Sequence, residues 1–329
     1  MLYAKDETGR LILAQEAHKD GHYRCPGCAQ TLILRQGITK RSHFAHQRQQ
    51  DCRIFSEGET EMHLGGKQLL LKWSQQAGFT AQLEAYLSDL KQRPDVLITR
   101  GNHQIALEFQ CASLPVQKLI ARSAGYQADG LDYFWFIGKN KNHPFSKQRR
   151  KLSQAVAKFL RYSDNLGFYL VFLNVGSKCF DLYYNIQQAD CLPLSYMYQR
   201  VANLHELRNF MQRKLRFPFR TLNDEERSLQ RRNYLRTVGR RQELANYCYL
   251  HHQTAQAANS LYVAPFYYPP IYVSDSCWWR AHCFLERMSS EMFLQEMHCH
   301  QTPFINQNCF WKLTWQLFQT ELANLQFRA

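Results

Sequence analysis

Two acidic residues, Asp95 and Glu108, stand in two short apolar segments that a turn signal joins. The dipeptide Gly101-Asn102 between them is typical of a two-residue β-hairpin turn. With this turn, Asp95 lies directly opposite Glu108 on one face of the hairpin, and the two Cβ atoms are about 4.5–5.5 Å apart. Two carboxylates at that distance repel each other unless a cation or a proton lies between them. The pair therefore predicts a divalent-metal site of the kind that hydrolyses phosphodiesters.

Gln110 extends this candidate site, because successive side chains of a strand point to opposite faces. It shares the face of Glu108, while Phe109 points away. The alternative is that each acid faces solvent on a half-exposed sheet, and for either acid alone that explanation is preferred. The combination of Pro-Asp at the start of one strand with Glu-x-Gln at the end of the next favours the metal site.

The positive charge of the chain is concentrated in one segment. The net charge is +14 over 329 residues, and residues 200–241 hold twelve Lys and Arg against four Asp and Glu. Such a segment suits a polyanion such as nucleic acid, and the alternative is a solvated basic helix without a partner. The candidate DNA-binding residues of this segment are Arg213, Lys214, Arg216, Arg231, Arg232, Arg240 and Arg241.

Composition also excludes some classes of protein. No run of eighteen apolar residues exists, so we expect no membrane span. The first six residues lack an apolar signal region, so we expect no secretory signal. The eleven cysteines form an odd set, and without export they are better explained as thiols or metal ligands than as disulfides.

A zinc site is predicted near the N-terminus. Cys25 and Cys28 form a CxxC pair, and His43 and His46 follow after fourteen intervening residues. Two thiolates and two imidazoles are the ligands of a tetrahedral structural zinc. If the histidine segment is extended, its two rings point to opposite faces, and Cys52 could then replace one of them. The alternative, a redox CxxC, lacks the βαβ context that it requires.

The remaining elements follow from hydrophobic periodicity. A helix is predicted from Ser56 to Trp73, with Glu59, His63 and Lys67 on one face. We then expect the following order: a strand at 79–87, the hairpin at 95–110, a helix at 114–126, a strand at 131–137, a helix at about 147–162, and strands at 167–174 and 178–186. Beyond about residue 190 the chain is predicted to be mostly helical and rich in aromatic residues.

These elements predict an α/β protein of three domains. The first is a small zinc-binding module over residues 1–55. The second, over 56–188, is a core with a mixed sheet. The third, over 189–329, is mainly helical, basic and rich in aromatic residues.

The motifs and their order resemble the competence protein CoiA family. The residues that carry the resemblance are the Cys-Pro-x-Cys at 25–28, the His-Phe-Ala-His at 43–46, and then Glu59-Thr60-Glu61-Met62-His63 with Lys67, Arg93-Pro94-Asp95-Val96 and Glu108-Phe109-Gln110. The resemblance is strong over about residues 1–140 and looser over 190–329. It implies a zinc-ribbon-type module joined to a nuclease-like domain of the PD-(D/E)xK superfamily. It also implies a cytoplasmic role in natural transformation, in which the protein assists recombination of incoming single-stranded DNA.

The resemblance also implies roles for individual residues. Asp95 and Glu108 look like the two motif acids, and Glu59 resembles the helical acid that completes a metal cluster. Gln110 stands where the superfamily usually has a lysine, although Glu-x-Gln is the pattern expected of this family. Lys67, on the same helix face as His63, is a candidate for the missing positive charge.

Arg122 and Tyr126 are similar in placement to a Gln-x-x-x-Tyr element of exonuclease-like members. Their spacing puts both on one helix face. The alternative, a surface arginine beside a core tyrosine, is equally supported by the sequence.

Residues and resemblance together predict a deoxyribonuclease that depends on Mg²⁺ or Mn²⁺. Its expected partner is single-stranded or branched DNA, and a strand-exchange recombinase and other competence proteins are further candidates. The main rival is a non-catalytic helper of recombination that binds single-stranded DNA and keeps the nuclease fold as a scaffold. A third class, an RNA-binding zinc protein, lacks the aromatic strand signature that it would need.

Overall fold

In the computed structural model the chain forms two compact units. The structure describes residues 3–25, 29–37, 42–46, 60–139, 145, 149–236, 238–253, 263–286, 289 and 298–326. Unit 1 comprises Met1–Asn140, Val171–Asp181 and Arg200–Phe210. Unit 2 comprises Lys141–Leu170, Leu182–Gln199 and Met211–Ala329.

The N-terminal part of unit 1 is a small antiparallel sheet. Its strands are β1 (Tyr3–Lys5), β2 (Leu11–Leu13), β3 (Tyr23–Arg24), β4 (Thr31–Arg35) and β5 (His43–His46), in the order β2-β1-β3-β4-β5. The core is small, and the rings of Tyr23 and Phe44 meet in it with centroids 4.8 Å apart. So small a core buries too little apolar surface to be stable without further support.

The predicted order of helix, strand, hairpin, helix and strand is confirmed in unit 1. The elements are α1 (Glu61–Gln76), β6 (Thr80–Leu83), β7 (Val96–Arg100), β8 (His103–Gln110), α2 (Val116–Ala128) and β9 (Asp132–Gly138). The predicted hairpin register is also confirmed, from Val96 opposite Leu107 to Arg100 opposite His103. Because β9 runs parallel to β8 while β7 is antiparallel to it, the sheet is mixed, as expected.

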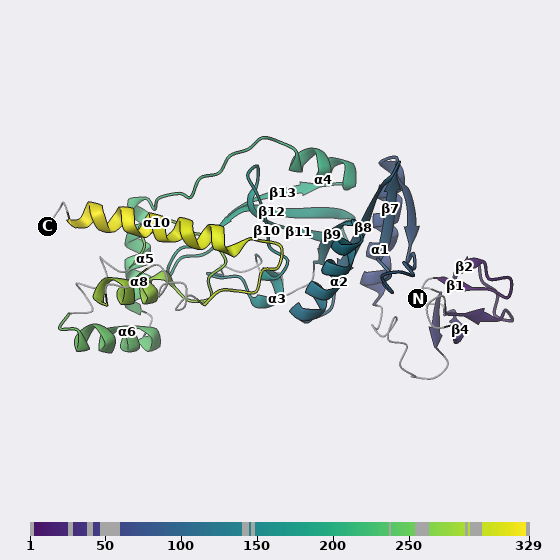
Figure 1. Cartoon of the computed structure of the whole chain (residues 1–329), viewed down its shortest axis with the longest axis horizontal. Coiled ribbons are helices and arrows are strands. Elements are labelled where there is room, and N and C mark those ends of the chain that lie inside the picture. The colour runs from purple at the N-terminus through teal and green to yellow at the C-terminus, as the bar shows by residue number, and fades with distance from the viewer. Residues whose placement is uncertain are drawn as a thin grey trace. The chain divides into compact units, whose positions relative to one another are not determined.

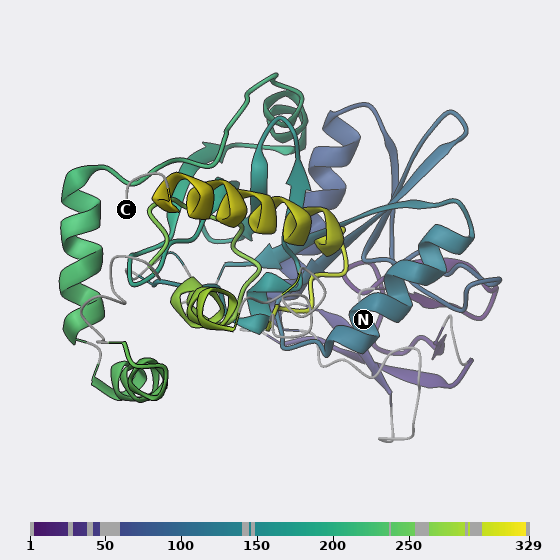
Figure 2. The ribbon, with the colours of Figure 1, turned by 60° about the vertical axis from the view of Figure 1, so that its left-hand side comes forward.

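Helices α1 and α2 cover opposite faces of this sheet (Figures 1 and 2). Gly66 of α1 lies against Phe109, so closely that an added Cβ would be 2.0 Å from the ring. Tyr126 of α2 reaches the neighbouring residue Glu108. Phe109 and Glu108 are neighbours in β8 and point to opposite faces of the sheet. The helices that contact them, α1 and α2, therefore lie on opposite faces. The glycine in α1 weakens the helix locally, but it allows this close packing.

The sheet continues through β11 (Gly167–Asn174), β12 (Cys179–Gln187) and β13 (Ser195–Val201), in the order β13-β12-β11-β9-β8-β7-β6, and β10 (Arg161–Ser163) pairs with β11. Strands β11, β12 and β13 each contain residues of both units. The expectation of a mostly helical chain beyond residue 190 missed β13.

The helix expected at about 147–162 is wrong for most of its described length. Only α3 (Gln154–Ala157) is helical, and Arg161–Ser163 forms strand β10 instead. Tyr162 pairs with Phe168 across a short connection to β11. Helical propensity is a weak determinant of structure, and at Arg161–Ser163 the pairing with β11 outweighs it.

Unit 2 also contains the C-terminal helices. The described ones in this unit include α5 (Asp224–Arg236), α6 (Val238–Leu250), α8 (Ser276–Leu285) and α10 (Gln307–Gln326), while α4 (Leu204–Met211) falls mostly in unit 1. Trp279 of α8 packs edge-on against Phe318 of α10, and Figure 2 shows the two helices side by side. The proline-rich stretch Pro265–Pro270 interrupts the helices, and Tyr268 in it pairs with Gln188.

Asp190 joins three segments of unit 2. Its buried carboxylate accepts hydrogen bonds from the hydroxyl of Tyr268 at 2.5 Å and from the hydroxyl of Ser276 at 2.6 Å. It also accepts the backbone N–H of Ser276 at 2.5 Å, at the start of α8. Each contact compensates for removing the carboxylate from water, so this buried acid has a structural explanation.

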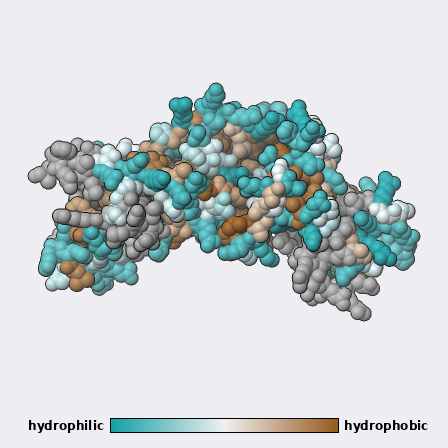
Figure 3. All heavy atoms as spheres, viewed as in Figure 1, coloured by the Kyte–Doolittle hydropathy of each residue, from teal (hydrophilic) through white to brown (hydrophobic). Residues whose placement is uncertain are grey.

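None of the helices that the structure describes is long and apolar enough to cross a bilayer. The face seen in Figure 3 is mainly hydrophilic, and hydrophobic residues form small separate patches on it.

Candidate active site

Asp95 lies immediately before β7, at the end of the hairpin. Its Oδ2 atom accepts the backbone N–H of Phe109 at 2.8 Å and lies 3.2 Å from Nε2 of His63. Lys67 Nζ is 3.9 Å from Oδ1. Burial opposes ionisation of Asp95, but the charge and hydrogen bond of His63 and the charge of Lys67 hold its pKa well below the ordinary value. Asp95 is therefore a mostly buried carboxylate that stays ionised.

Glu108 lies in β8 on the side of α2. Its Oε1 atom accepts a hydrogen bond from Arg122 at 2.6 Å and another from the hydroxyl of Tyr126. Burial and the charge of Asp95 raise the pKa of Glu108, whereas Arg122 and Tyr126 lower it, and the net result is a pKa of about 7. The structure thus brings Arg122 and Tyr126 together on one acid, and the arginine is not merely a surface residue.

The two acids are neighbours, but their carboxylates turn to different helices. Continuing the hairpin register by one residue pairs Asp95 with Glu108, as the turn signal predicted. The carboxylate of Asp95 contacts His63 of α1, whereas that of Glu108 contacts Tyr126 of α2. The acids therefore influence each other through their charges, and each has its own partners.

Sequence reasoning missed Glu84 as a site residue. It follows β6 directly and adopts the left-handed backbone conformation, with φ of 52°. Its buried carboxylate binds Lys67 Nζ at 2.5 Å through Oε1 and Arg93 at 2.8 Å through Oε2. The structure shows why it lies here: Leu83 pairs with Val96, so the acid one residue after Leu83 lies beside Asp95.

Gln110 ends β8 and is nearly buried. Its side-chain amide donates a hydrogen bond of 2.9 Å to the carbonyl of Ala112, two residues later in the chain. One amide donor is therefore used locally. The cation next to Asp95 is supplied by Lys67 from α1, which the sequence had suggested as the substitute for the usual lysine.

Glu59, the third expected metal ligand, lies outside the described residues. Helix α1 begins at Glu61, after the N-cap Thr60, whose hydroxyl accepts the backbone N–H of His63 at 3.2 Å. Within the residues that the structure describes, no group of three or more His, Cys, Asp or Glu side chains could hold a metal ion.

The two described acids nevertheless suit a hard divalent cation. Both hydrogen bonds that the described residues make to Glu108 go to Oε1, and both of those made to Asp95 go to Oδ2. Within this part of the chain, the second oxygen of each carboxylate has no hydrogen bond. Mg²⁺ is usually held by one or two carboxylates, and water and substrate phosphate complete its six positions. The donor set therefore fits Mg²⁺ or Mn²⁺.

The N-terminal module separates the two predicted histidine ligands. Cys25 directly follows β3 and Gln30 directly precedes β4, and the Cys25 N–H donates to the Gln30 carbonyl at 2.8 Å. In β5, His46 pairs with Leu32 close to these two residues, whereas His43 pairs at the far end of β4. Three residues of strand span about 10 Å. His46 is therefore the histidine on the Cys25 side. Cys28 and Cys52 lie outside the described residues.

The described basic residues of 200–241 lie at the surface. Exposed side chains belong to Arg213, Lys214 and Arg216, between α4 and α5, and to Arg231 and Arg232 on α5. Arg240 and Arg241 lie in α6, and their side chains are outside the described set. The aromatic residues of this segment are buried or half-buried, namely Phe210, Phe217, Phe219 and Tyr234. They do not form an exposed stacking surface between the basic residues.

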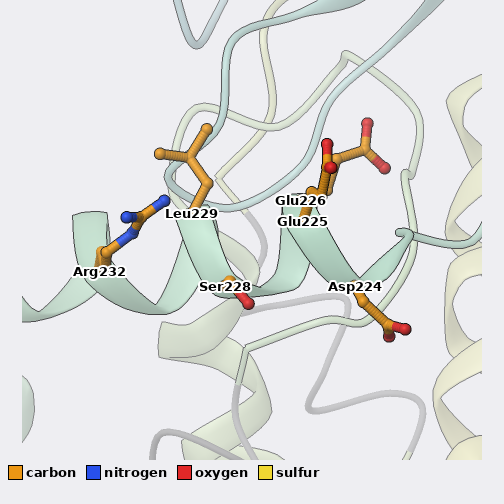
Figure 4. Close-up of a pocket in the computed structure, with 6 residues that line it drawn as sticks. All are labelled: Asp224, Glu225, Glu226, Ser228, Leu229 and Arg232. Atoms are coloured by element: carbon orange, nitrogen blue, oxygen red, sulfur yellow. The ribbon is translucent and has the colours of Figure 1, made fainter.

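A pocket lies along α5 (Figure 4). The end of this pocket at the start of the helix is acidic and therefore unsuited to phosphate. Asp224, Glu225 and Glu226 line it at the start of the helix, and Arg232 lies toward its other end. The charge of Glu226 is matched by Arg220, which binds it with two hydrogen bonds of 2.8 and 2.9 Å. Phosphate contacts of α5 are therefore expected from Arg231 and Arg232 rather than from its first turn.

The elements from α1 to β9 in unit 1 form an α/β domain with two acids at the end of a hairpin and a helix on each face of its sheet, and they lie within the residues that a nuclease-like family model matches. The sequence model described as "Competence protein CoiA, nuclease-like domain" matches residues 59–215, and that described as "Competence protein CoiA, N-terminal domain" matches residues 10–55. The chain belongs to the competence protein CoiA family.

A curated relative supports this assignment. Competence protein CoiA of Bacillus subtilis (strain 168) is 33% identical over 133 residues, which is 40% of this chain and 36% of that protein. The chain therefore matches about a third of the length of this relative. No solved structure gives a significant match.

Proposed function

We propose that this chain processes DNA in natural genetic transformation, as a deoxyribonuclease that depends on Mg²⁺ or Mn²⁺ and acts on single-stranded or branched DNA. The observation that carries the proposal is the pair Asp95 and Glu108. At one end of the hairpin Glu108 is buried and Asp95 is 13% exposed, and each has one oxygen that accepts hydrogen bonds from the protein and one without a hydrogen bond from the described residues. Membership of the CoiA family supports the link to competence.

The metal would be held by Asp95 and Glu108, with Glu59 as a further candidate ligand. When bound, it would polarise the scissile phosphate and lower the pKa of a water molecule. Arg122 and Tyr126 orient Glu108 through Oε1, and His63 orients Asp95 through Oδ2.

Lys67 supplies the positive charge of the usual lysine, whose position Gln110 occupies in this chain. Its ammonium group is held by Glu84 and lies next to Asp95, where a phosphate would approach. A fixed cation at this position stabilises negative charge that develops in the transition state.

The basic residues of the C-terminal part would bind the DNA backbone without reading its sequence. Arg213, Lys214 and Arg216 are exposed in the connection between α4 and α5, and Arg231 and Arg232 are exposed on α5. Each phosphate neutralised on a single strand contributes about −0.7 to the slope of log affinity against log salt concentration. Affinity should therefore fall steeply with salt.

The N-terminal module would be stabilised by a structural zinc ion. Cys25 and His46 lie toward the same end of its sheet, and Cys28 and Cys52 are the candidates for the remaining positions. Zinc in such a site contributes folding free energy directly, which suits a module with so small a core.

The rival function is a non-catalytic helper that binds single-stranded DNA. Two observations favour it. Gln110 replaces the usual lysine, and its amide is hydrogen-bonded to Ala112. Burial also opposes the ionised form of Glu108, which a metal ligand requires.

A cleavage assay decides between the two functions. Purified protein is incubated with labelled single-stranded, duplex and branched DNA, with Mg²⁺, Mn²⁺ or EDTA. We expect cleavage with metal only, and a loss of at least about 100-fold in Asp95→Asn, as for removal of a principal catalytic group. The matched control is Asp89→Asn, because Asp89 is exposed and its one described hydrogen bond comes from Ser88.

Two results would change the conclusion. Cleavage that persists in Asp95→Asn would exclude this site. A wild-type protein that binds DNA but cleaves none of the substrates with either metal would establish the non-catalytic helper instead.

A further inference from the structure

Two exposed tyrosines lie along β13, the last strand of the large sheet in the described part of the chain. Tyr196 is 40% exposed and Tyr198 is 44% exposed. They are two residues apart in a strand, so they lie on the same face. Both rings contact Tyr183 of β12, with centroid distances of 5.4 and 5.1 Å. All three residues belong to unit 2.

Inner aromatic rings hold these tyrosines in place. Phe145 stacks on Tyr183 with centroids 4.1 Å apart and an angle of 8° between the rings. Phe145 also meets Tyr196 edge-on at 4.6 Å. Tyr183 itself is buried, so Tyr196 and Tyr198 rest on a fixed support and keep much of their own surface exposed. Rings that are ordered before binding lose little conformational entropy when a ligand stacks on them.

The charge around this aromatic pair favours a polyanion. Unit 2 contains 21 Lys and Arg against 11 Asp and Glu, whereas unit 1 contains 20 against 16. Arg149 and Arg150 are exposed, and the carbonyl of Arg149 accepts the N–H of Leu194, one residue before β13. Within 182–199 the sequence has one acidic residue, Asp190, and its carboxylate is buried among its partners.

No comparable pair was found among the other exposed tyrosines of the described residues. Tyr249 is 79% exposed on α6, but no second exposed aromatic residue lies two positions away in a strand. Tyr162 packs against Phe168 and Phe310. The aromatic residues between 200 and 241 are buried or half-buried.

We propose that Tyr196 and Tyr198 form a platform on which bases of single-stranded DNA stack, while Arg149 and Arg150 attract the adjacent phosphates. This inference rests on the proposed function, because it assumes that single-stranded DNA is the substrate and names residues that bind it. Every base has a flat π-face, so stacking on aromatic rings tolerates any sequence. Such a surface suits a protein that handles incoming DNA without selecting its sequence.

The test measures binding of the full-length protein to a fluorescent oligo-dT in EDTA, so that cleavage plays no part. We expect Tyr196→Ala/Tyr198→Ala to bind at least about 30-fold more weakly, as the loss of stacking on two rings implies. The variant Tyr196→Phe/Tyr198→Phe should bind like the wild type, because the rings remain. The matched control is Tyr249→Ala, which removes an exposed tyrosine from the same basic unit and should have no effect.

Abasic oligonucleotide of equal length separates stacking from charge. The wild type should bind it more weakly than oligo-dT, and the double alanine variant should bind it as the wild type does. The slope of log affinity against log salt concentration should be the same for both proteins, because no phosphate contact is removed.

Three outcomes would overturn the inference. Equal binding of oligo-dT by wild type and the double alanine variant would exclude the platform. Equal binding of abasic and normal DNA by the wild type would do the same without any variant that could misfold. A wild type that binds no single-stranded DNA would refute both the platform and the proposed DNA partner, whereas DNA binding without cleavage would refute only the nuclease activity.

Discussion

The ammonium group of Lys67 lies 2.5 Å from the carboxylate of Glu84, and both side chains are buried. The same ammonium group is 3.9 Å from Asp95. A lysine removed from water needs such partners to remain charged, because burial alone favours its neutral form. Glu84 thus holds a cation from α1 at the end of the hairpin, next to the first of the two candidate metal ligands.

This relationship predicts strong coupling between Lys67 and Glu84. Lys67→Met should lower the free energy of unfolding by about 3–5 kcal/mol, because it removes one partner of a buried ion pair. Lys67→Met/Glu84→Gln should lose clearly less than the sum of the two single variants. Urea denaturation measures all three, and Glu61→Gln, at an exposed position of α1, is the control. Additive effects would show that the pair is not coupled.

Glu84→Gln tests the positioning of Lys67 in the proposed reaction. The lysine loses its charged partner while Asp95 and Glu108 stay in place, so cleavage should fall by about 10-fold to 100-fold. DNA affinity should not change, because Glu84 is buried away from solvent. A cleavage rate equal to that of the wild type would remove Lys67 and Glu84 from the catalytic proposal.

The raised pKa of Glu108 predicts how stability depends on pH without metal. Its pKa rises from 4.5 to about 7, so its contribution to stability is full below pH 4.5 and is lost as pH rises through 7. Between pH 5 and 8, metal-free wild type should lose stability relative to Glu108→Gln, by at most about 3 kcal/mol. Urea denaturation in EDTA at the two pH values measures this change. Parallel pH dependence in the two proteins would contradict it.

The strand register of the N-terminal module predicts that His46 is a zinc ligand and that His43 is not. Wild type should carry about one zinc ion per chain, and Cys25→Ser or His46→Ala should lose it. His43→Ala should retain it, because His43 pairs with Arg35 at the far end of β4. Metal analysis of the purified proteins measures the zinc content. Zinc loss in His43→Ala with retention in His46→Ala would reverse the assignment.

Gly66→Ala should destabilise the protein, although a Gly→Ala substitution in a helix usually stabilises it. In an open helix position, Gly→Ala stabilises a protein by about 1 kcal/mol. At Gly66 the new Cβ would lie 2.0 Å from Phe109, so Gly66→Ala should destabilise the protein by about 1–3 kcal/mol through overpacking. Gln75→Ala, at an exposed position in the last turn of α1, is the control. Stabilisation by Gly66→Ala in thermal unfolding would contradict this packing.

The sequence determined the hairpin and the identity of its two acids. The Gly101-Asn102 turn sets the pairing of the strands, and alternation then decides which residues share a face. The same local rules located the helix that carries Arg122 and Tyr126. They overestimated the helix near residue 150 and missed β13, because pairing with a neighbouring strand outweighs local preference.

Only the tertiary structure decided which side chains meet. Glu84 reaches Lys67 because α1 packs on the sheet through Gly66, and a contact between residues seventeen positions apart leaves no local pattern in the sequence. The choice between a surface and a site position for Arg122 depended likewise on the face of the sheet that α2 covers. Turn chemistry and alternation act within a few residues, whereas the contacts that set charge and burial depend on how whole elements pack.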